Sequence, residues 1–87
     1  MISKTRPSFR RLYAGLSDEA KSRARTAYTL FLKDPNHPSL RFKKLKGSSN
    51  LWSARINDQY RAVGVRQGNS IEWIWIGTHN DFDKQFS

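Results

Sequence analysis

The sequence predicts one α+β domain, 1–87, in which two N-terminal helices pack on a small, twisted antiparallel sheet. Residues 7–33 carry apolar side chains at helical spacing, whereas residues 40–77 have the composition of strands. The segments between those strands are short, and short connections join antiparallel neighbours. Helices that precede such a meander cover one of its faces, and 87 residues leave no room for a second domain.

The two helices have recognisable ends. The first is expected to start at Pro7, because proline lacks the N–H that a first helical turn leaves unpaired. The second is expected to follow Ser17 as its N-cap and to end at Lys33, before Asp34-Pro35. The apolar faces consist of Phe9, Leu12, Tyr13 and Leu16 in the first helix, and of Ala20, Ala24, Ala27, Tyr28 and Phe31 in the second.

The strands are expected at about 40–46, 51–56, 60–66 and 70–77. If residues 57–59 form a three-residue loop, Arg55 lies opposite Arg61 on one face of the sheet. The same register pairs Ala54 with Ala62 on the other face, where two small side chains leave room for a helix to sit close.

The register of the last strand depends on its loop. A three-residue loop at 67–69 would put Trp73 and Trp75 on the same face as the two arginines. A two-residue loop would move both tryptophans to the other face, so both arrangements are open at this point.

Charge is the most informative feature of the composition. Sixteen Lys and Arg against seven Asp and Glu give a net charge of +9, which fits a polyanionic partner, either a nucleic acid or an acidic protein. The alternative is a basic surface that serves only solubility. The sequence has no cysteine, no signal peptide and no transmembrane run, so we expect a soluble, cytoplasmic protein with no membrane partner.

Basic side chains gather on the predicted sheet. Arg55 and Arg61 would repel each other as direct neighbours, unless they hold an anion or splay into solvent. Segment 41–47, RFKKLKG, adds backbone-binding candidates, and two aromatic residues are candidates for base stacking. These RNA-binding candidates are Arg41, Lys43, Lys44, Lys46, Trp75 and Phe82. Cations interleaved with aromatic rings suit a single RNA strand.

His79 follows the most apolar strand and is the strongest candidate for general acid–base chemistry, because imidazole titrates near neutrality. Asp81 or Asp83 is expected to orient its ring. The alternative is a histidine that only caps the end of the strand. His37 and His79 are unrelated in spacing, so we expect no metal site, and no glycine-rich loop indicates a nucleotide cofactor.

Three ordered strings, DPNHPSLRFKKLKG, LWSARINDQYRAVG and IEWIWIGTHNDFD, resemble the RelE/ParE family of toxins from type II toxin–antitoxin systems. The resemblance spans nearly the whole chain and implies a compact RelE-like α+β fold with a concave sheet. RelE-type members of the family are metal-independent endoribonucleases that cut mRNA on the ribosome. ParE-type members poison DNA gyrase instead.

The resemblance also assigns roles to residues. Arg61, in its Y-R context, matches an arginine that RelE-type nucleases use at the scissile phosphate, and Arg55 matches a position that is usually basic in them. Ser53 stands where another lysine is common. His79 matches a catalytic histidine of the YafQ-like branch. The tyrosine that is common near this point is missing, and the nearby phenylalanines have no hydroxyl to replace it.

These observations lead us to expect a ribosome-dependent, metal-independent mRNA endonuclease with Arg61, His79 and Arg55 as its catalytic residues. Its partners would be a cognate antitoxin, mRNA and the ribosome, and it would need no cofactor. Two alternatives are a ParE-type toxin that cleaves no nucleic acid and an inactive, basic RNA-binding relative.

Overall fold

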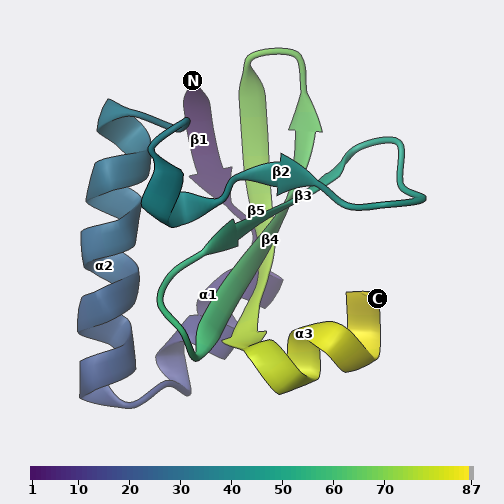
Figure 1. The fold of residues 1–87 in the computed structure, drawn as a ribbon. Helices are drawn as coiled ribbons and strands as arrows, with labels where there is room; N and C mark the ends of the chain where they lie inside the picture. Colours follow the sequence, from purple (N-terminus) through teal and green to yellow (C-terminus); the bar gives the residue numbers. More distant parts are fainter. Residues whose placement is uncertain (87) are drawn as a thin grey trace.

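The computed structural model describes residues 1–86, which form one five-stranded sheet with helices on both faces (Figure 1). The strands lie in the order β1-β5-β4-β3-β2. Along the chain the elements are β1 (Ile2–Thr5), α1 (Pro7–Ala14), α2 (Asp18–Lys33), the short 3-10 helix η1 (Pro38–Leu40), β2 (Lys43–Lys44), β3 (Leu51–Arg55), β4 (Tyr60–Gln67), β5 (Ser70–Thr78) and α3 (His79–Phe86). The predicted α+β class is confirmed.

Both predicted helices are confirmed, with the expected ends. Pro7 is the first residue of α1. The Ser17 hydroxyl oxygen accepts a hydrogen bond from the backbone N–H of Ala20 at 3.1 Å, which makes Ser17 the N-cap of α2. α2 ends at Lys33, and Asp34 is its C-cap. No helix within residues 1–86 has the length and hydrophobicity needed to span a membrane.

Two elements, β1 and α3, were not predicted. β1 pairs with β5 in parallel, with Ile2 opposite Ser70, so the sheet is mixed rather than antiparallel throughout. Its four residues alternate in exposure but carry no apolar run, and their partner strand lies at the far end of the chain. α3 has only two large apolar side chains, Phe82 and Phe86, which is a weak helical pattern.

The strand predicted at 40–46 is wrong in extent, because β2 spans only Lys43–Lys44. Pro38 starts η1 just before it, and Arg41 ends η1 with a left-handed backbone, φ 43°. A strand needs a continuously extended backbone, so pairing begins only after this turn.

The predicted register of β3 and β4 is confirmed. Arg55 lies opposite Arg61, and Ala54 lies opposite Ala62. Asn57 shapes the turn between the strands. Its side-chain oxygen accepts hydrogen bonds from the backbone N–H groups of Gln59 and Tyr60, both at 2.9 Å.

The hairpin of β4 and β5 has the two-residue loop of the second expected arrangement, but it does not place both tryptophans as that arrangement predicted. Its turn has two residues, Gly68-Asn69. A register shift lies between Val63 and Gly64 of β4, which pair with Trp75 and Trp73 of β5. Ile74 is the extra residue of this β-bulge, which reverses the alternation of side chains along β5. Trp73 therefore faces α1 and α2, whereas Trp75 faces α3, so neither expectation holds for both tryptophans.

A separate hydrophobic core covers each face of the sheet. Under the N-terminal helices, the ring of Phe31 meets Trp73 edge-on, with 5.3 Å between centroids. On the opposite face, Trp75 packs against Phe86 of α3, also at 5.3 Å. The larger core comprises the buried residues Ala24, Phe31, Leu40, Ala54, Ala62, Ile71, Trp73 and Ile76, and the smaller one comprises Leu45, Val63 and Trp75.

We expect Gly64→Ala to destabilise the fold, because a Cβ at this position would lie 2.8 Å from Cγ1 of the buried Ile71 and 3.0 Å from the Trp73 ring. Overpacking of this kind costs about 1–3 kcal/mol of unfolding free energy, to be measured by urea denaturation. Gly15→Ala is the matched control, since its Cβ would meet only backbone at 3.6 Å. A Gly64→Ala variant as stable as the wild type would contradict this packing.

Candidate nucleic-acid interface

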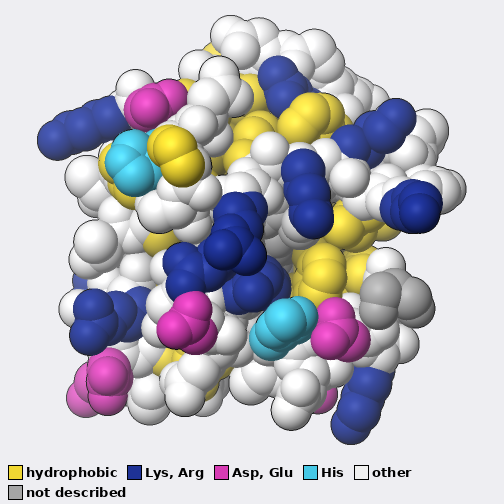
Figure 2. Space-filling view, viewed as in Figure 1, with side chains coloured by type: hydrophobic (Ala, Val, Ile, Leu, Met, Phe, Trp, Pro, Cys, Tyr) yellow, Lys and Arg dark blue, Asp and Glu magenta, His cyan; other side chains and the backbone are white. Residues whose placement is uncertain are grey.

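Three arginines gather on the face of the sheet that α3 partly covers. Arg55 and Arg61 are cross-strand partners, and Gly77 of β5 is the next residue across the sheet from Arg61. Arg41 lies close enough for its charge to act on Arg61. Figure 2 shows Lys and Arg side chains grouped in the middle of this face, with no large acidic patch over them. We call Arg41, Arg55 and Arg61 the arginine cluster.

Arg61 is half-buried, as Arg55 is, whereas Arg41 is exposed. Its Nη1 donates hydrogen bonds to the backbone oxygens of Asn57 at 2.6 Å and Tyr60 at 3.0 Å. Burial, and then the positive charges of Arg55 and Arg41, lower the pKa of Arg61 from its ordinary value. An arginine still stays charged at neutral pH, and a bound anion would offset the repulsion from Arg55 and Arg41.

Arg55 and Arg41 are held by local structure. Arg55 pairs with the exposed carboxylate of Asp58 and donates a second, longer hydrogen bond to the backbone oxygen of Ser39 at 3.4 Å. Arg41 has the left-handed backbone described above, which costs about 1–3 kcal/mol in a residue other than glycine. Asp58 was not predicted as part of the site, although its place in the loop between the two paired arginines is a usable signal.

His79 begins α3 at the edge of the arginine cluster. Its backbone N–H donates to the Gln59 oxygen at 2.7 Å, and Thr78 caps the helix by accepting a hydrogen bond from the Asp81 N–H at 3.1 Å. The exposed imidazole places Nε2 3.4 Å from Oδ2 of Asp83, one helical turn later. Within residues 1–86, Asp83 rather than Asp81 is therefore the carboxylate beside this ring.

Asp83 also links the histidine to the arginines. Its negative charge raises the pKa of Arg61, opposing the effect of burial, so it acts on Arg61 as well as on His79. Figure 2 shows a histidine, in cyan, between the central basic group and an acidic side chain. Guanidinium groups and an imidazole ring thus lie on one open surface.

Trp75 is not available for stacking on RNA bases. Its side chain is 9 % exposed and packs on the rings of Phe82 and Phe86. Its indole also lies over Gly77, where an added Cβ would be 2.6 Å from Cζ2. Trp75 therefore belongs to the core under α3. Of the two predicted aromatic residues, only the half-buried Phe82 is partly exposed.

The predicted lysines divide between the two faces of the sheet. Lys43 pairs with Ser53 and shares the face of the arginine cluster, whereas Lys44 pairs with Trp52, which contributes to the core under α1 and α2. Lys46 is exposed in the loop that follows β2. The structure therefore brings Lys43, but not Lys44, to the arginine cluster.

The second histidine of the chain has a structural role. The Nδ1 atom of His37 accepts a hydrogen bond from the backbone N–H of Ser39 at 3.2 Å, which makes it the N-cap of η1. Among residues 1–86, no three His, Cys, Asp or Glu side chains gather in a way that could hold a metal ion.

A comparison with protein families places this sequence in a class of proteins. The sequence model of the ParE-like toxin domain matches residues 18–84, which include β2 to β5, the arginine cluster and His79. The chain belongs to the ParE-like toxin family. It is therefore a toxin of the toxin–antitoxin class, as the resemblance to the RelE/ParE family predicted. No curated protein sequence matches the chain.

Solved structures of related toxins share the fold of this ParE-like domain. The YoeB/ParE toxin from Agrobacterium tumefaciens is 21% identical with a TM-score of 0.70, and the alignment covers 91% of this chain and 99% of that one. YafQ from E. coli is 10% identical, with a TM-score of 0.73 and coverage of 92% and 94%. A chain of the RelB–RelE antitoxin–toxin complex from Methanococcus jannaschii is 15% identical, with a TM-score of 0.73 and coverage of 95% and 98%. The predicted RelE-like fold is confirmed.

Inorganic phosphate should stabilise the toxin domain through the arginine cluster. At ten times its dissociation constant, a ligand of the native state adds about 1.4 kcal/mol to the unfolding free energy, or about 6–11 °C in Tm for a domain of this size. The reference is chloride at equal ionic strength.

Arg41→Asn should reduce this phosphate effect without loss of stability in chloride, because asparagine tolerates a left-handed backbone and removes one repelling charge. Arg23→Asn, an exposed change on α2, is the control and should keep the full effect. An equal phosphate effect in both variants would place the anion outside the arginine cluster.

Proposed function

We propose that this toxin domain is a ribosome-dependent endoribonuclease that cleaves mRNA without a metal in the chemical step and is held inactive by an antitoxin. The observation that carries the proposal is the arginine cluster beside the exposed His79–Asp83 pair on one face of the sheet. Guanidinium groups bind phosphate in a fixed geometry, and imidazole transfers protons near neutral pH. Because mRNA is translated in the cytoplasm, the proposal places the protein there.

The chemistry would be a transesterification within the RNA. The 2′-hydroxyl attacks the adjacent phosphorus, and the bond from phosphorus to the 5′-oxygen breaks, giving a 2′,3′-cyclic phosphate and a 5′-hydroxyl. One proton leaves the 2′-hydroxyl and one reaches the 5′-oxygen. Arg61 and Arg55 would stabilise the charge that develops on the non-bridging oxygens. His79 would exchange one of the two protons, with Asp83 orienting its ring.

The similar structures support the antitoxin in this proposal. Two of them are RelE–RelB complexes, from Pyrococcus horikoshii and Methanococcus jannaschii, in which a chain with this fold is bound to its antitoxin partner. A net charge of +9 also favours binding to an acidic partner. Both features fit a basic toxin that is neutralised by a second protein.

A gyrase poison that cleaves no nucleic acid is the second candidate function. The family match is to the ParE-like domain, and the tyrosine expected near His79 for the RelE-type reaction is replaced by residues without a phenolic hydroxyl. Loss of mRNA cleavage in every assay, together with inhibition of DNA supercoiling by the wild-type protein, would favour this candidate.

We expect His79→Ala to slow single-turnover mRNA cleavage on programmed ribosomes by about 10²–10⁴-fold, the usual contribution of a general acid or base. Arg61→Ala should slow it by about 10²–10³-fold through lost charge stabilisation. Asn80→Ala, an exposed neighbour of His79 on α3, is the matched control. Enzyme is saturating, and melting temperatures are compared to verify folding.

The RNA products distinguish the proposed reaction from hydrolysis. A 2′,3′-cyclic phosphate end is expected, whereas a 3′-hydroxyl end would contradict the proposed transesterification. A His79→Ala variant that cleaves mRNA at the wild-type rate would show that His79 has no catalytic role and only begins α3.

RNA binding should depend on Lys43 but not on Lys44, the two residues of β2. Lys43→Ala is expected to weaken binding to single-stranded RNA and to reduce the slope of log affinity against log salt by about 0.7, the effect of one lost phosphate contact. Lys44→Ala makes the same chemical change on the opposite face and should leave both quantities unchanged. Fluorescence anisotropy across a salt series measures both, and equal losses would contradict the assignment of faces.

A further inference from the structure

The short helix η1 contacts two members of the arginine cluster. The backbone oxygen of Ser39, in the middle of η1, accepts a hydrogen bond from Nη1 of Arg55 at 3.4 Å. The residue that follows η1 is Arg41, whose backbone N–H donates to the Pro38 oxygen at 3.2 Å and so closes the turn. The geometry of the arginine cluster therefore depends on a turn of three residues, 38–40.

Arg41 holds a backbone conformation that arginine rarely adopts. Its φ of 43° and ψ of 44° lie in the left-handed region, where glycine or asparagine fits more easily. Within residues 1–86, Arg41 is the only residue other than glycine with a positive φ. Such a conformation persists only where the surrounding structure determines it, and residues of this kind gather at functional sites. The strain at Arg41 must therefore be sustained by the turn that precedes it.

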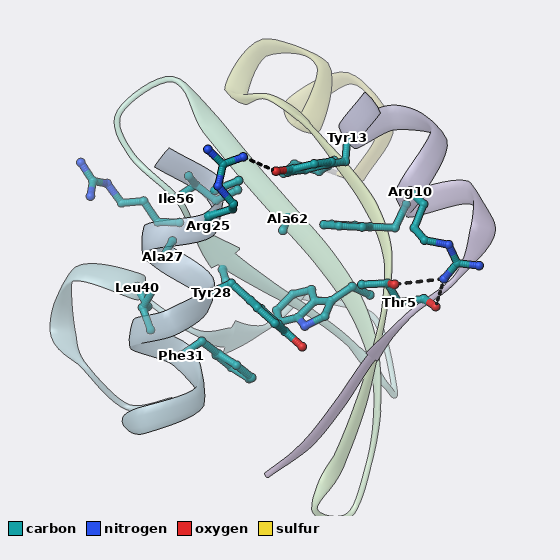
Figure 3. A pocket seen from close by; sticks show the side chains of 16 residues that line it. Thr5, Arg10, Tyr13, Arg25, Ala27, Tyr28, Phe31, Leu40, Ile56 and Ala62 are labelled. Carbon is teal, nitrogen blue, oxygen red and sulfur yellow. Dashed lines mark hydrogen bonds between the residues drawn. The ribbon is translucent and has the colours of Figure 1, made fainter. Parts of the chain in front are cut away.

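Leu40 anchors the turn in the larger core. Its side chain is 2% exposed. Figure 3 shows Leu40 near Ala27 and Phe31 of α2, at the margin of an open apolar pocket of about 220 Å³ between the N-terminal helices and the sheet. Burial of Leu40 fixes where η1 lies. The backbone of so short a 3-10 helix still needs hydrogen bonds to hold one conformation, because its own are few and of poorer geometry.

His37 supplies one of these hydrogen bonds from its side chain. Nδ1 of His37 accepts from the backbone N–H of Ser39 at 3.2 Å, and the Ser39 hydroxyl lies 2.9 Å from the same atom. The N–H groups of Leu40 and Arg41 donate to backbone oxygens instead. Of the amides at 39–41, that of Ser39 is thus the one that relies on a side chain, as the first amides of a helix do.

We propose that His37 is a positioning residue for the phosphate site, because its N-cap holds η1 in the conformation from which Arg41 reaches the arginine cluster. The charge of Arg41 acts on Arg61 in this arrangement, and Arg55 is bonded to the same turn. His37 itself contacts neither the RNA nor the reacting atoms in this role. The inference rests on the proposed function, because it assumes that the arginine cluster binds a phosphate of RNA.

The cap acts on the population of the binding conformation. Without it, η1 opens and only a fraction of molecules present Arg41 to the phosphate. The apparent dissociation constant equals the intrinsic constant divided by that fraction. Loss of an N-cap typically shifts such an equilibrium about fivefold. Because the strain at Arg41 already opposes the closed turn, a shift of this size lowers the binding-competent fraction directly.

The test titrates inorganic phosphate at an ionic strength kept constant with chloride, and follows the backbone amide signals of Arg55 and Arg61 by NMR. His37→Ala removes the acceptor and should raise the phosphate dissociation constant about fivefold. His37→Asn restores it, because the side-chain oxygen of asparagine is attached to Cγ as Nδ1 is, and should bind like the wild type. Asn36→Ala, an exposed change just outside the cap, is the control with wild-type affinity.

A double-mutant cycle tests whether His37 acts through Arg41. Arg41→Asn removes the charge that the cap positions, so adding His37→Ala to this variant should weaken phosphate binding by less than about twofold more. Fivefold losses in both backgrounds would show that the two residues act independently. That result would overturn the link between the cap and Arg41.

Cleavage of mRNA provides a second readout, because positioning and proton transfer change different quantities. In His37→Ala, the enzyme concentration that gives half of the maximal single-turnover rate should rise about fivefold. The rate at saturation should stay within about twofold of the wild type, since saturating RNA selects the competent conformation. A saturated rate lowered about 100-fold or more would make His37 a proton-transferring group and overturn its positioning role.

Thermal melting in chloride verifies that each variant is folded at the temperature of the titration. If His37→Ala is not, His37→Gln takes its place. Glutamine carries its amide one carbon further from the backbone and is not a preferred N-cap, so it should weaken phosphate binding as His37→Ala would.

The outcomes separate this inference from the proposed function. A wild-type protein that binds no phosphate at the arginine cluster would overturn the anion site of the proposed function and this inference with it. A wild-type protein that binds phosphate, with His37→Ala binding equally well, would overturn only the role of His37. If His37→Asn binds as weakly as His37→Ala, the ring acts through something other than its cap, and the inference fails.

Discussion

The β-bulge at Ile74 is the constraint on which both faces of the molecule depend. A regular strand would direct Trp73 and Trp75 to one face and leave the other without a tryptophan ring of β5. The extra residue sends Trp73 to the core under the N-terminal helices and Trp75 to the core under α3. One strand, β5, thus supplies an aromatic ring to each of the two cores.

The two faces that result have different physical properties. On one, like charges are held together, because the backbone of β3 and β4 fixes Arg55 beside Arg61 despite their repulsion. On the other, apolar surface is left uncovered over the paired alanines. Each arrangement costs stability in the isolated chain, the first through charge repulsion and the second through apolar surface left in contact with water.

The parts of the fold that local chemistry determines could be predicted from the sequence. Ser17 caps α2, and the Asn57 turn sets the register that pairs Arg55 with Arg61. The bulge could not be predicted, because residues 73–76 are all apolar and show no alternation to reveal a change of face. In the site, Asp83 could not be chosen over Asp81 as the partner of His79, because that choice requires the helix α3. The short, polar sequence of α3 gave too weak a helical signal.

The parallel pairing of β1 with β5 has a consequence for synthesis of the chain. α1, α2, η1, β2, β3 and β4 lie between the two strands in the sequence, so β1 leaves the ribosome well before its partner, residues 70–78. Contacts between distant segments form slowly, because a long loop must close before they contribute any stability. The sheet is therefore completed only after β5 has emerged, and a nascent chain that stops before β5 leaves β1 without its partner strand.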